Sequence, residues 1–297
     1  MRTGVEADQS AYFDAERSAE VVNLRMSPEV SPRLAEVMRV IVEHLHAAVK
    51  EARITSEEWM AGIQFLTETG LKCTDWRQEF ILLSDVLGVS MLVDAINHER
   101  PAGSTENTVL GPFHVSGAPR YPAGADINLD GKGEPTVVSG RVLDTEGKPI
   151  EGATLDVWQA NEAGFYDVQQ RDIQPQWNLR GLFETDSDGR YWFRSAKPLY
   201  YPIPDDGPVG KLLTSLGRHP YRPAHLHFIV QAPGYETVVT HIFTPDCPYL
   251  SEDPVFGVKD SLIADFRKVD ASDEAERLGV RAPFWKVNWD FVLVRTA

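Results

Sequence analysis

Two histidines in an apolar segment are the residues of this chain best suited to chemistry. His225 and His227 lie in Arg222-Pro223-Ala224-His225-Leu226-His227-Phe228-Ile229-Val230, whose apolar residues favour a strand. Residues two apart on a strand point to the same face with their Cβ atoms ~7 Å apart, so both imidazoles can bind one metal ion. A His-x-His pair alone is weak evidence, and it predicts a metal site only together with further ligands.

Two tyrosines upstream lie in unusual Gly- and Pro-rich settings. Tyr166 follows a strand end that runs into a glycine-containing turn, Trp158 to Phe165. Tyr201 lies in the segment from Pro198 to Pro208, whose prolines favour an extended loop of low conformational entropy. A single tyrosine is more often a ring packed on a sheet with its hydroxyl in water. The two tyrosines and two histidines together favour a metal centre, and no cysteine or carboxylate cluster accompanies them to complete a zinc site.

Composition limits the class of protein. The chain has 297 residues, with 42% hydrophobic and 25% charged residues, as in ordinary globular proteins. Its formal net charge of −15 argues against a nucleic-acid partner, because phosphate backbones bind basic surfaces. The sequence shows neither a signal peptide nor an apolar run of about twenty residues, which predicts no membrane span. Cys73 and Cys247 lie far apart, which favours free thiols and a cytoplasmic location.

The hydrophobic periodicity changes near residue 100. Ser31 and Pro32 begin a predicted helix with an apolar stripe of Leu34, Val37, Ile41 and Leu45. Thr55 and Glu58 form a capping-box pattern for a second helix. Asp75 and Gln78 repeat this start signal before a third apolar pattern, predicted as one helix, of Phe80, Leu83, Leu87 and Met91. We therefore expect a helical domain over residues 1–105.

Beyond Pro101, short β-rich runs alternate with turns rich in Gly, Pro, Asn and Asp. The predicted strands are 136–143, 154–158, 191–194, 225–230, 238–243 and 289–294. Short helices are predicted at 210–216 and 259–268. Strands at this spacing favour an antiparallel β-sandwich, so the predicted fold class is α+β, with residues 106–297 as the catalytic sandwich domain.

Several longer motifs occur in a fixed order. They are Leu110-Gly111-Pro112-Phe113, the segment from Trp158 to Tyr166, Arg190 to Ser195, Tyr201 to Pro208, and Gly217-Arg218-His219 leading into Arg222 to His227. With these motifs the chain resembles the intradiol ring-cleaving dioxygenases, the catechol and hydroxyquinol 1,2-dioxygenase family. The resemblance covers nearly the whole chain, the helical part included.

The resemblance implies a non-haem ferric iron, Fe(III), with four protein ligands. Tyr166 and Tyr201 match the tyrosinate ligands, and His225 and His227 match the imidazole ligands. Tyr201 and His227 would be axial, and a hydroxide would complete the equatorial plane. The donor set agrees with this assignment, because a phenol with a pKa of about 10 stays ionised near neutrality only beside a strong Lewis acid. The 2-His-1-carboxylate face typical of Fe(II) oxygenases is a different pattern.

The resemblance also implies how the substrate is activated. An aromatic diol binds through both oxygens, Tyr201 and the hydroxide take up its two protons, and O₂ attacks the bound ring. Arg222 matches an arginine beside the ring, where a fixed cation stabilises developing negative charge. Fourteen residues beyond the second histidine, catechol-type members usually carry Gln and this chain carries His241. We place His241 among the substrate-binding residues without assigning it to iron.

Substrate preference is predicted from segments that resemble the hydroxyquinol branch, Ile81 to Leu92, Tyr201 to Pro204 and Val255 to Lys259. In that branch the pocket positions correspond to Leu82, Asp85, Val109, Gly111, Pro112, Phe113, Ile203 and Val255. Asp85 carries the chemical argument, since a carboxylate can accept a hydrogen bond from a third ring hydroxyl, although a solvated helix aspartate is an equal reading of this residue. Benzene-1,2,4-triol (hydroxyquinol) is the favoured substrate, with catechol or a chlorinated or methylated catechol as the alternative.

Readings from other classes stay open on the sequence alone. The strands from Thr136 to Asp144 and Ala153 to Trp158 also resemble the opening of transthyretin-like sandwich modules, which can be purely binding proteins. A zinc hydrolase is a weaker third reading. Colour separates them, since tyrosinate bound to Fe(III) is red to burgundy. The apolar surface of the first long helix, widened by Met38, Val40 and Val42, predicts a homodimer through the amino-terminal helices. The resemblance implies a channel for a phospholipid at that interface.

Overall fold

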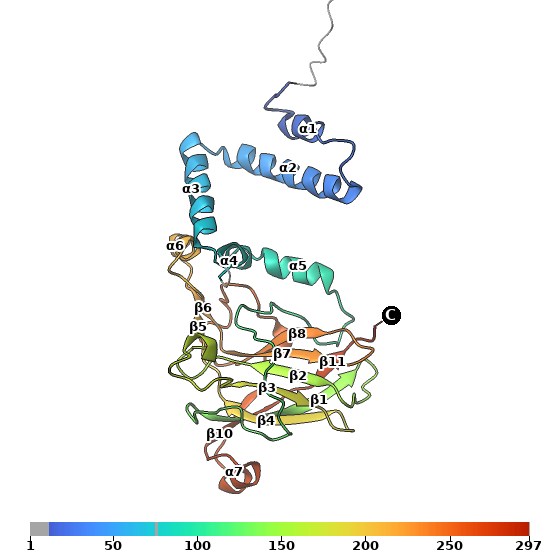
Figure 1. Cartoon of the computed structure of the whole chain (residues 1–297), viewed down its shortest axis with the longest axis vertical. Helices are drawn as coiled ribbons and strands as arrows, with labels where there is room; N and C mark the ends of the chain where they lie inside the picture. Colours follow the sequence, from blue (N-terminus) through green and yellow to red (C-terminus); the bar gives the residue numbers. More distant parts are fainter. Residues whose placement is uncertain (1–11, 75–76, 297) are drawn as a thin grey trace, which may run out of the picture. The chain divides into compact units, whose positions relative to one another are not determined.

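The structure is a computed structural model that describes residues 12–74 and 77–296 (Figure 1). The described chain is helical up to residue 97 and consists mainly of strands from residue 135 onward. It divides into two compact units, one ending at Glu68 and the other beginning at Thr69. The expected fold class, a helical amino-terminal region followed by a mainly antiparallel sandwich, is confirmed.

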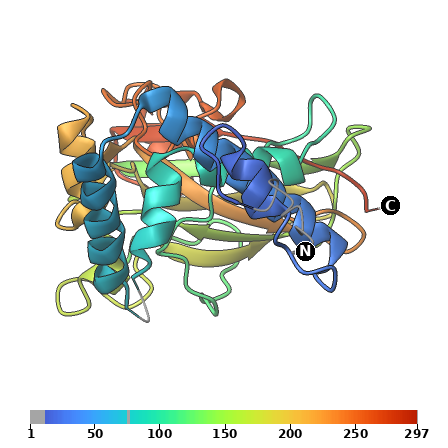
Figure 2. The same ribbon diagram turned by 90° about the horizontal axis from the view of Figure 1, so that it is seen from above.

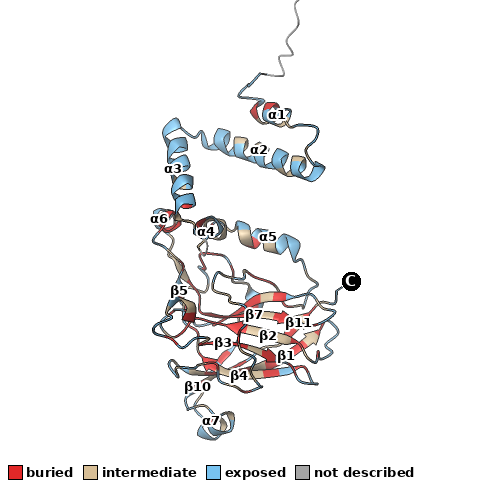
Figure 3. Ribbon diagram, in the orientation of Figure 1, coloured by how far each residue is buried: buried red, intermediate tan, exposed pale blue. Residues whose placement is uncertain are grey.

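The first unit holds α1 (Ser18–Asn23), α2 (Pro32–Ala52) and most of α3 (Ser56–Lys72). The predicted capping box is present, because the Thr55 amide donates to Glu58 Oε2 at 2.8 Å and the Glu58 amide donates to Thr55 Oγ1 at 3.2 Å. Helix α1 packs on α2, and the hydroxyl of Ser18 lies 3.0 Å from His46 Nδ1. None of the residues of α2 is buried, and Figure 3 shows this helix largely as exposed surface.

The third predicted helix is two helices, α4 (Glu79–Val86) and α5 (Val89–Asn97). Asp75, part of its predicted start signal, lies outside the described residues. The expectation of one continuous helix was wrong because Gly88 adopts a left-handed conformation, with φ of 74°, between them. The Gly88 amide donates to the carbonyl of Asp85 at 2.9 Å and closes α4 with a turn. Both helices belong to the same compact unit as the strands.

Within residues 77–296, the strands form a five-stranded sheet, a four-stranded sheet and a two-stranded ribbon. The five-stranded sheet has the order β11-β1-β10-β9, with β4 also paired to β1. Its strands are β1 (Pro135–Asp144), β4 (Arg190–Ala196), β9 (Phe266–Val269), β10 (Phe284–Asn288) and β11 (Phe291–Leu293). The pairings of β1 with β10 and with β11 are parallel, whereas the other pairings are antiparallel.

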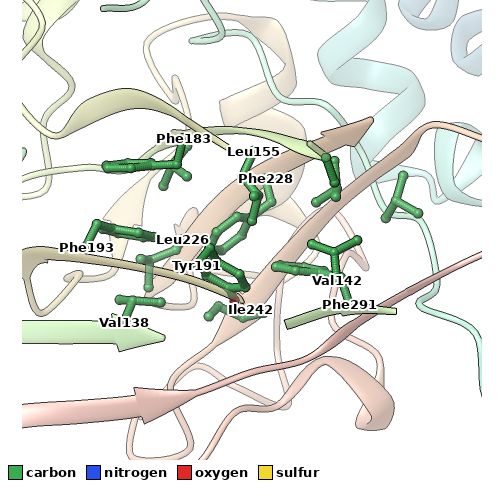
Figure 4. Packing of buried hydrophobic residues seen from close by; sticks show 14 of the residues in the cluster. Val138, Val142, Leu155, Phe183, Tyr191, Phe193, Leu226, Phe228, Ile242 and Phe291 are labelled. Atoms are coloured by element: carbon green, nitrogen blue, oxygen red, sulfur yellow. The ribbon is translucent and has the colours of Figure 1, made fainter. Parts of the chain in front are cut away.

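The four-stranded sheet has the order β3-β2-β7-β8 and is antiparallel throughout. Its strands are β2 (Thr154–Trp158), β3 (Arg180–Glu184), β7 (His225–Gln231) and β8 (Val238–Phe243). The two sheets enclose the main hydrophobic core (Figure 4). One sheet contributes Leu155, Phe183, Leu226, Phe228 and Ile242, and the other contributes Val138, Val142, Tyr191, Phe193 and Phe291.

The remaining elements are short. They are the ribbon of β5 (Tyr201–Pro202) and β6 (Tyr221–Arg222), the helices α6 (Pro208–Ser215) and α7 (Ser272–Leu278), and the 3₁₀ turns Asp167–Gln169 and Asp260–Leu262. The helix expected over 259–268 was wrong, since this segment holds a 3₁₀ turn and the beginning of β9. The ribbon and α6 lie at one end of the sheets, and the chain leaves β11 toward the other end (Figures 1 and 2).

Candidate metal centre and active site

Strand β7 separates the core of the sandwich from the candidate metal centre. Its residues Leu226, Phe228 and Val230 face the main core, so His225 and His227 point to the opposite face of the four-stranded sheet. On that face His227 is paired across the strands with Trp158 of β2 and with His241 of β8. The alternation of strand side chains thus places two imidazoles on one face, as the sequence predicted.

Tyr166 is positioned by the turn that follows β2. The side chain of Asn161 closes this turn by accepting from the amides of Ala163 and Phe165, each at 3.0 Å. Asp167, which directly follows Tyr166, is buried and accepts a hydrogen bond from Arg180 Nε at 2.6 Å, and this bond anchors the segment to β3. The Tyr166 ring is fully buried and stacks on Phe113, with ring centroids 4.6 Å apart.

Tyr201 and Arg222 are neighbours in the two-stranded ribbon, where they form a cross-strand pair. Tyr201 is therefore directed toward the same region as Tyr166, and their rings meet edge to face at 5.3 Å. Both tyrosines belong to a small buried cluster with Trp158 and Ala160, separate from the main core. The ribbon thus places two candidate functional residues, Tyr201 from the Pro-rich segment and Arg222 from β6, beside each other.

Four polar atoms converge in this cluster. Tyr166 Oη lies 3.1 Å from Tyr201 Oη and 2.8 Å from His227 Nε2. His227 Nε2 in turn lies 3.0 Å from His225 Nε2. The two tyrosines and two histidines predicted from the sequence are brought together, with the oxygen and nitrogen atoms that can bind a metal facing one another.

The protonation of the cluster favours a bound cation. His225 Nδ1 lies 2.6 Å from the carbonyl of Pro223, which can only accept, so Nδ1 carries the proton and Nε2 presents a lone pair to the cluster. Burial, together with the charge of Arg222, lowers the pKa of His225 to about 3, and burial also holds the pKa of His227 well below its ordinary value. Burial raises the pKa of Tyr166 well above 10.0. A metal ion at this point would use the lone pairs and stabilise the Tyr166 phenolate, which burial alone disfavours.

His241 is the third imidazole of the cluster. It is fully buried, and its ring centroid lies 4.1 Å from that of His227 and 4.6 Å from that of His225. The three histidines can present ligand nitrogens within 4.8 Å of one another. The backbone of Val109 is a hydrogen-bonding group for the His241 ring, and it opposes in part the effect of burial on the pKa of this imidazole. Burial lowers its pKa well below the ordinary value, so His241 is neutral in the folded protein.

Arg222 is buried beside the cluster and forms an ion pair with Asp253. Its Nε and Nη2 atoms donate to the two carboxylate oxygens of Asp253 at 3.2 and 3.1 Å. Burial alone would favour a neutral guanidine, but the charge of Asp253, its hydrogen bond and the two neighbouring tyrosines together outweigh burial and raise the pKa of Arg222. Asp253 also accepts from the amides of Val255 and Gly257 at 3.2 and 2.9 Å. A permanent cation is thus fixed at the centre by a buried counter-charge.

Asp85 lies in the last turn of α4 and is half-buried. Burial raises its pKa, while Ser90 and the charge of Arg222 oppose that shift in part and the charge of Asp253 adds to it. The charges of Arg222 and Asp253 therefore act on this carboxyl in opposite directions. Leu82, one turn earlier on α4, is also half-buried.

The other predicted pocket residues have different environments. Gly111 has φ of 78°, and a Cβ atom there would lie 3.0 Å from His227 Cε1, so a side chain would press on this imidazole. Ile203 and Val255 are buried, Val109 and Phe113 are half-buried, and Pro112 is exposed. The segment before Val109 is fixed to β8, because the Thr108 amide donates to the carbonyl of Val239 at 2.9 Å.

Sequence reasoning missed residues that support the centre. Asp253 is 31 positions from Arg222, and no local pattern marks it as the partner of that arginine. Trp158 was only part of a motif, yet its ring stacks on His227 at 4.6 Å with an interplanar angle of 11°. The available signal was strand alternation on β2, since Leu155 and Val157 face the main core and Trp158 therefore points to the opposite face.

The chain matches families over both of its parts. Residues 31–105 match the family described as Catechol dioxygenase N terminus, and residues 110–295 match the family described as Dioxygenase. A hydroxyquinol 1,2-dioxygenase of Rhizobium sp. (strain MTP-10005) is 63% identical over 285 residues, which are 96% of this chain and 97% of that protein.

The chain belongs to the intradiol ring-cleavage dioxygenases.

Solved structures agree with this membership. The crystal structure of hydroxyquinol 1,2-dioxygenase from Pseudomonas putida DLL-E4 has a TM-score of 0.88 and 47% identity, covering 95% of this chain and 97% of that one. Catechol 1,2-dioxygenase of Acinetobacter radioresistens has a TM-score of 0.82 and 30% identity, covering 97% and 95% of the respective chains. This intradiol dioxygenase is therefore an enzyme, and the readings as a binding module or a zinc hydrolase fall away.

Proposed function

We propose that this enzyme is a hydroxyquinol 1,2-dioxygenase. With O₂ it cleaves benzene-1,2,4-triol between the two adjacent hydroxyl-bearing carbons and forms 3-hydroxy-cis,cis-muconate, or maleylacetate as its keto form, in the degradation of aromatic compounds. The observation that carries the proposal is the 63% identity to the Rhizobium hydroxyquinol 1,2-dioxygenase over nearly the full length of both chains. Asp85 supplies a hydrogen-bond acceptor for the third ring hydroxyl of this substrate, and the charge of Arg222 acts on its carboxyl.

We propose Fe(III) as the cofactor, held by Tyr166, Tyr201, His225 and His227. The proposal is supported by four facing donor atoms separated by 2.8 to 3.1 Å and by the Nε2 lone pair of His225. Two phenolate oxygens and two imidazoles form a donor set that is harder than thiolates and more anionic than imidazoles alone, which suits a trivalent iron. When bound, Fe(III) supplies a Lewis acid that keeps both phenols ionised, colours the protein red to burgundy, and receives the two adjacent substrate oxygens.

Each remaining group has a role that follows from its charge and position. Tyr201, ionised beside the bound iron, would accept a proton from one substrate hydroxyl, and its ribbon partner Arg222 would stabilise the negative charge left on the substrate oxygen. Arg222, fixed by Asp253, stabilises negative charge that develops on the ring and its oxygens. Asp85 accepts a hydrogen bond from the third hydroxyl. His241 is buried edge to face against His227, and burial favours its neutral form.

The test is a substrate panel assayed by oxygen uptake, with the iron content of the same preparation measured. We expect about one iron per chain, a broad visible band, and a higher kcat/KM for hydroxyquinol than for catechol, 3-chlorocatechol or 4-methylcatechol. A preference for catechol in the unaltered enzyme would contradict the substrate proposal and leave the alternative, a catechol 1,2-dioxygenase. A colourless active protein without iron would contradict the cofactor proposal.

We further propose that the enzyme is a homodimer held through its amino-terminal helices. Exposed apolar residues line α2 at Leu34, Met38, Ile41 and Leu45, and their spacing of four, three and four residues is that of a helix-pairing seam. The apolar channel implied at such an interface would accommodate the acyl chains of a phospholipid. Phospholipid extraction from the purified dimer followed by mass spectrometry tests this part separately.

Location and membrane association follow from different observations. Among the described residues, no helix combines the length and the apolar composition that crossing a bilayer requires. We propose a cytoplasmic location, which the free thiols of Cys73 and Cys247 support. Fractionation of cells that express the enzyme tests this proposal.

A further inference from the structure

Arg218 connects two parts of the substrate pocket that are distant in sequence. Its Nη1 atom donates to the carbonyl of Val86 at 2.6 Å, and its Nη2 atom donates to the carbonyl of Pro254 at 2.8 Å. Val86 is the last residue of α4 and follows Asp85, whereas Pro254 lies between Asp253 and Val255. One guanidinium therefore binds the backbone next to two proposed pocket residues.

The aromatic ring of Phe256 packs between the Arg218 guanidinium and the turn after α4. The guanidinium carbon lies 5.0 Å from the ring centroid of Phe256, within the range of a cation–π contact. The same ring closes against the turn after α4, because a Cβ atom on Gly88 would lie 3.4 Å from Phe256 Cδ2. Helix α4 and the 253–257 segment thus meet at Phe256, with the guanidinium holding both backbones.

The backbone of Arg218 is held in place by helix α6. Its amide donates to the carbonyl of Leu213 at 2.9 Å, which holds it directly after α6. At the other end of α6, the amide of Val209 lies 3.4 Å from Oε1 of Glu79, the fully buried first residue of α4. Helix α4 is therefore tied at its beginning to the start of α6 and at its end to Arg218.

We propose that Arg218 is a positioning residue for substrate specificity, which fixes Asp85 and Val255 at the separation that a third ring hydroxyl requires. The proposal rests on the proposed hydroxyquinol activity. A planar guanidinium suits the task because its two terminal nitrogens donate in fixed, diverging directions, whereas an ammonium is a single point donor. Both hydrogen bonds go to backbone carbonyls, so Arg218 acts by holding the chain in place.

The test compares Arg218→Ala and Arg218→Lys with a control variant, Arg267→Ala, whose exposed side chain pairs with Asp265 on the surface. The readout is the ratio of kcat/KM for hydroxyquinol to kcat/KM for catechol, with iron content and visible spectrum recorded for each protein. We expect the ratio to fall about fivefold in Arg218→Ala, as for the loss of one hydrogen bond to the third hydroxyl. Arg218→Lys should lose about half of that factor, and the control should match the unaltered enzyme.

A double variant identifies the path of the effect. If Arg218 acts through Asp85, the combination Asp85→Ala with Arg218→Ala should have the same ratio as Asp85→Ala alone. A ratio in Arg218→Ala equal to that of the unaltered enzyme would overturn the proposal. If both kcat/KM values also fell by the same factor, Arg218 would have only a general structural role. If Arg218→Ala does not fold, a fully retained ratio in Arg218→Lys overturns it instead. A preference of the unaltered enzyme for catechol contradicts the proposed function and is visible before any variant is made.

Discussion

At the scale of single residues, the centre is a set of buried polar groups whose oxygen and nitrogen atoms face one another. Two imidazole Nε2 atoms lie 3.0 Å apart, and one of them has its lone pair toward the other because its Nδ1 proton binds Pro223. Burial favours the neutral forms of His225 and Tyr166. Such an arrangement is costly unless a cation is shared by the donors, so removal of a donor should weaken the site directly.

Variants of the four donors should separate their roles. Tyr201→Phe or His227→Ala should strip iron or abolish cleavage, because each removes a ligand of the proposed set. Tyr166→Phe should remove much of the visible band, since tyrosinate-to-iron charge transfer produces it. Iron analysis and visible spectroscopy give the measurement, with Tyr200→Phe as control because its ring packs on Tyr249 outside the centre. Full colour and activity in both Tyr166→Phe and Tyr201→Phe would end the ferric-tyrosinate proposal.

Asp85 should make substrate preference depend on pH. Burial raises the pKa of its carboxyl, so this group takes up a proton at a higher pH than an exposed aspartate as the solution is acidified. The ionised form is the better acceptor for the third hydroxyl, and its loss should lower the hydroxyquinol-to-catechol ratio of kcat/KM on the acidic side. Asp85→Asn should lower the ratio about fivefold at neutral pH, as expected for ~1 kcal/mol, and should flatten its pH profile. A ratio with the same pH profile in both proteins would exclude this role.

At the scale of elements, β1 changes its parallel partner part-way along its length. Residues 136–139 pair with β10, and residues 142–144 pair with β11. The connection between β10 and β11 crosses β1 at Gly140, where a Cβ atom would lie 1.7 Å from the carbonyl oxygen of Trp289. The Trp289 amide donates to the carbonyl of Ser139 at 2.8 Å and fixes this crossing. A side chain at position 140 would force two strands of the sandwich apart.

Gly140→Ala should therefore destabilise the sandwich domain by ~3 kcal/mol, the upper range for overpacking of a close-packed interior. Thermal unfolding monitored by circular dichroism measures the effect. Gly62→Ala is the matched control, because no atom lies within 4 Å of a Cβ at that position of α3. Replacing a helical glycine by alanine should stabilise α3 by ~1 kcal/mol. An unchanged melting temperature for Gly140→Ala would mean that the β10–β11 connection moves aside easily.

At the scale of the whole molecule, α2 presents an apolar stripe that the described residues of its own unit, 12–68, leave exposed. Helix α1 packs on the side of α2 that carries His46, whereas Ile41 and Leu45 stay exposed. A chain with a net charge of −15 repels its copies at long range, so association requires a local apolar contact of this kind. The seam on α2 is the basis of the dimer proposal.

Ile41→Glu should convert the proposed dimer to monomer, or to aggregate where the apolar surface is left uncovered. In a two-fold symmetric contact, one substitution places two like charges opposite each other. Size-exclusion chromatography with light scattering measures the mass, and the visible band should persist because the proposed iron ligands lie in the other compact unit. Glu36→Lys, a charge change at an exposed residue on the opposite face of the same helix, serves as control. A monomeric unaltered enzyme at micromolar concentration would contradict the dimer proposal.

Local patterns in the sequence determined which residues could form the centre and on which elements they lie. The alternation along β7 put His225 and His227 on one face, and the capping box placed the start of α3. These features follow from side-chain period and backbone hydrogen bonding over a few residues, which the sequence contains directly. The glycine that divides α4 from α5 was visible too, but a glycine inside a helical pattern costs only ~1 kcal/mol and does not by itself predict a break.

Only the tertiary structure decided which distant groups meet. Asp253 neutralises Arg222 from 31 residues away, and Arg218 holds a carbonyl of α4 that lies 132 residues earlier in the chain. The parallel pairing of β1 with β10 and β11 likewise joins opposite ends of the sandwich sequence, where an antiparallel sandwich was expected. No periodicity encodes such partners, because each depends on how the sheets and loops pack around the core. The sequence therefore determined the chemistry that this enzyme carries, and packing determined how firmly its charges and pocket walls are held.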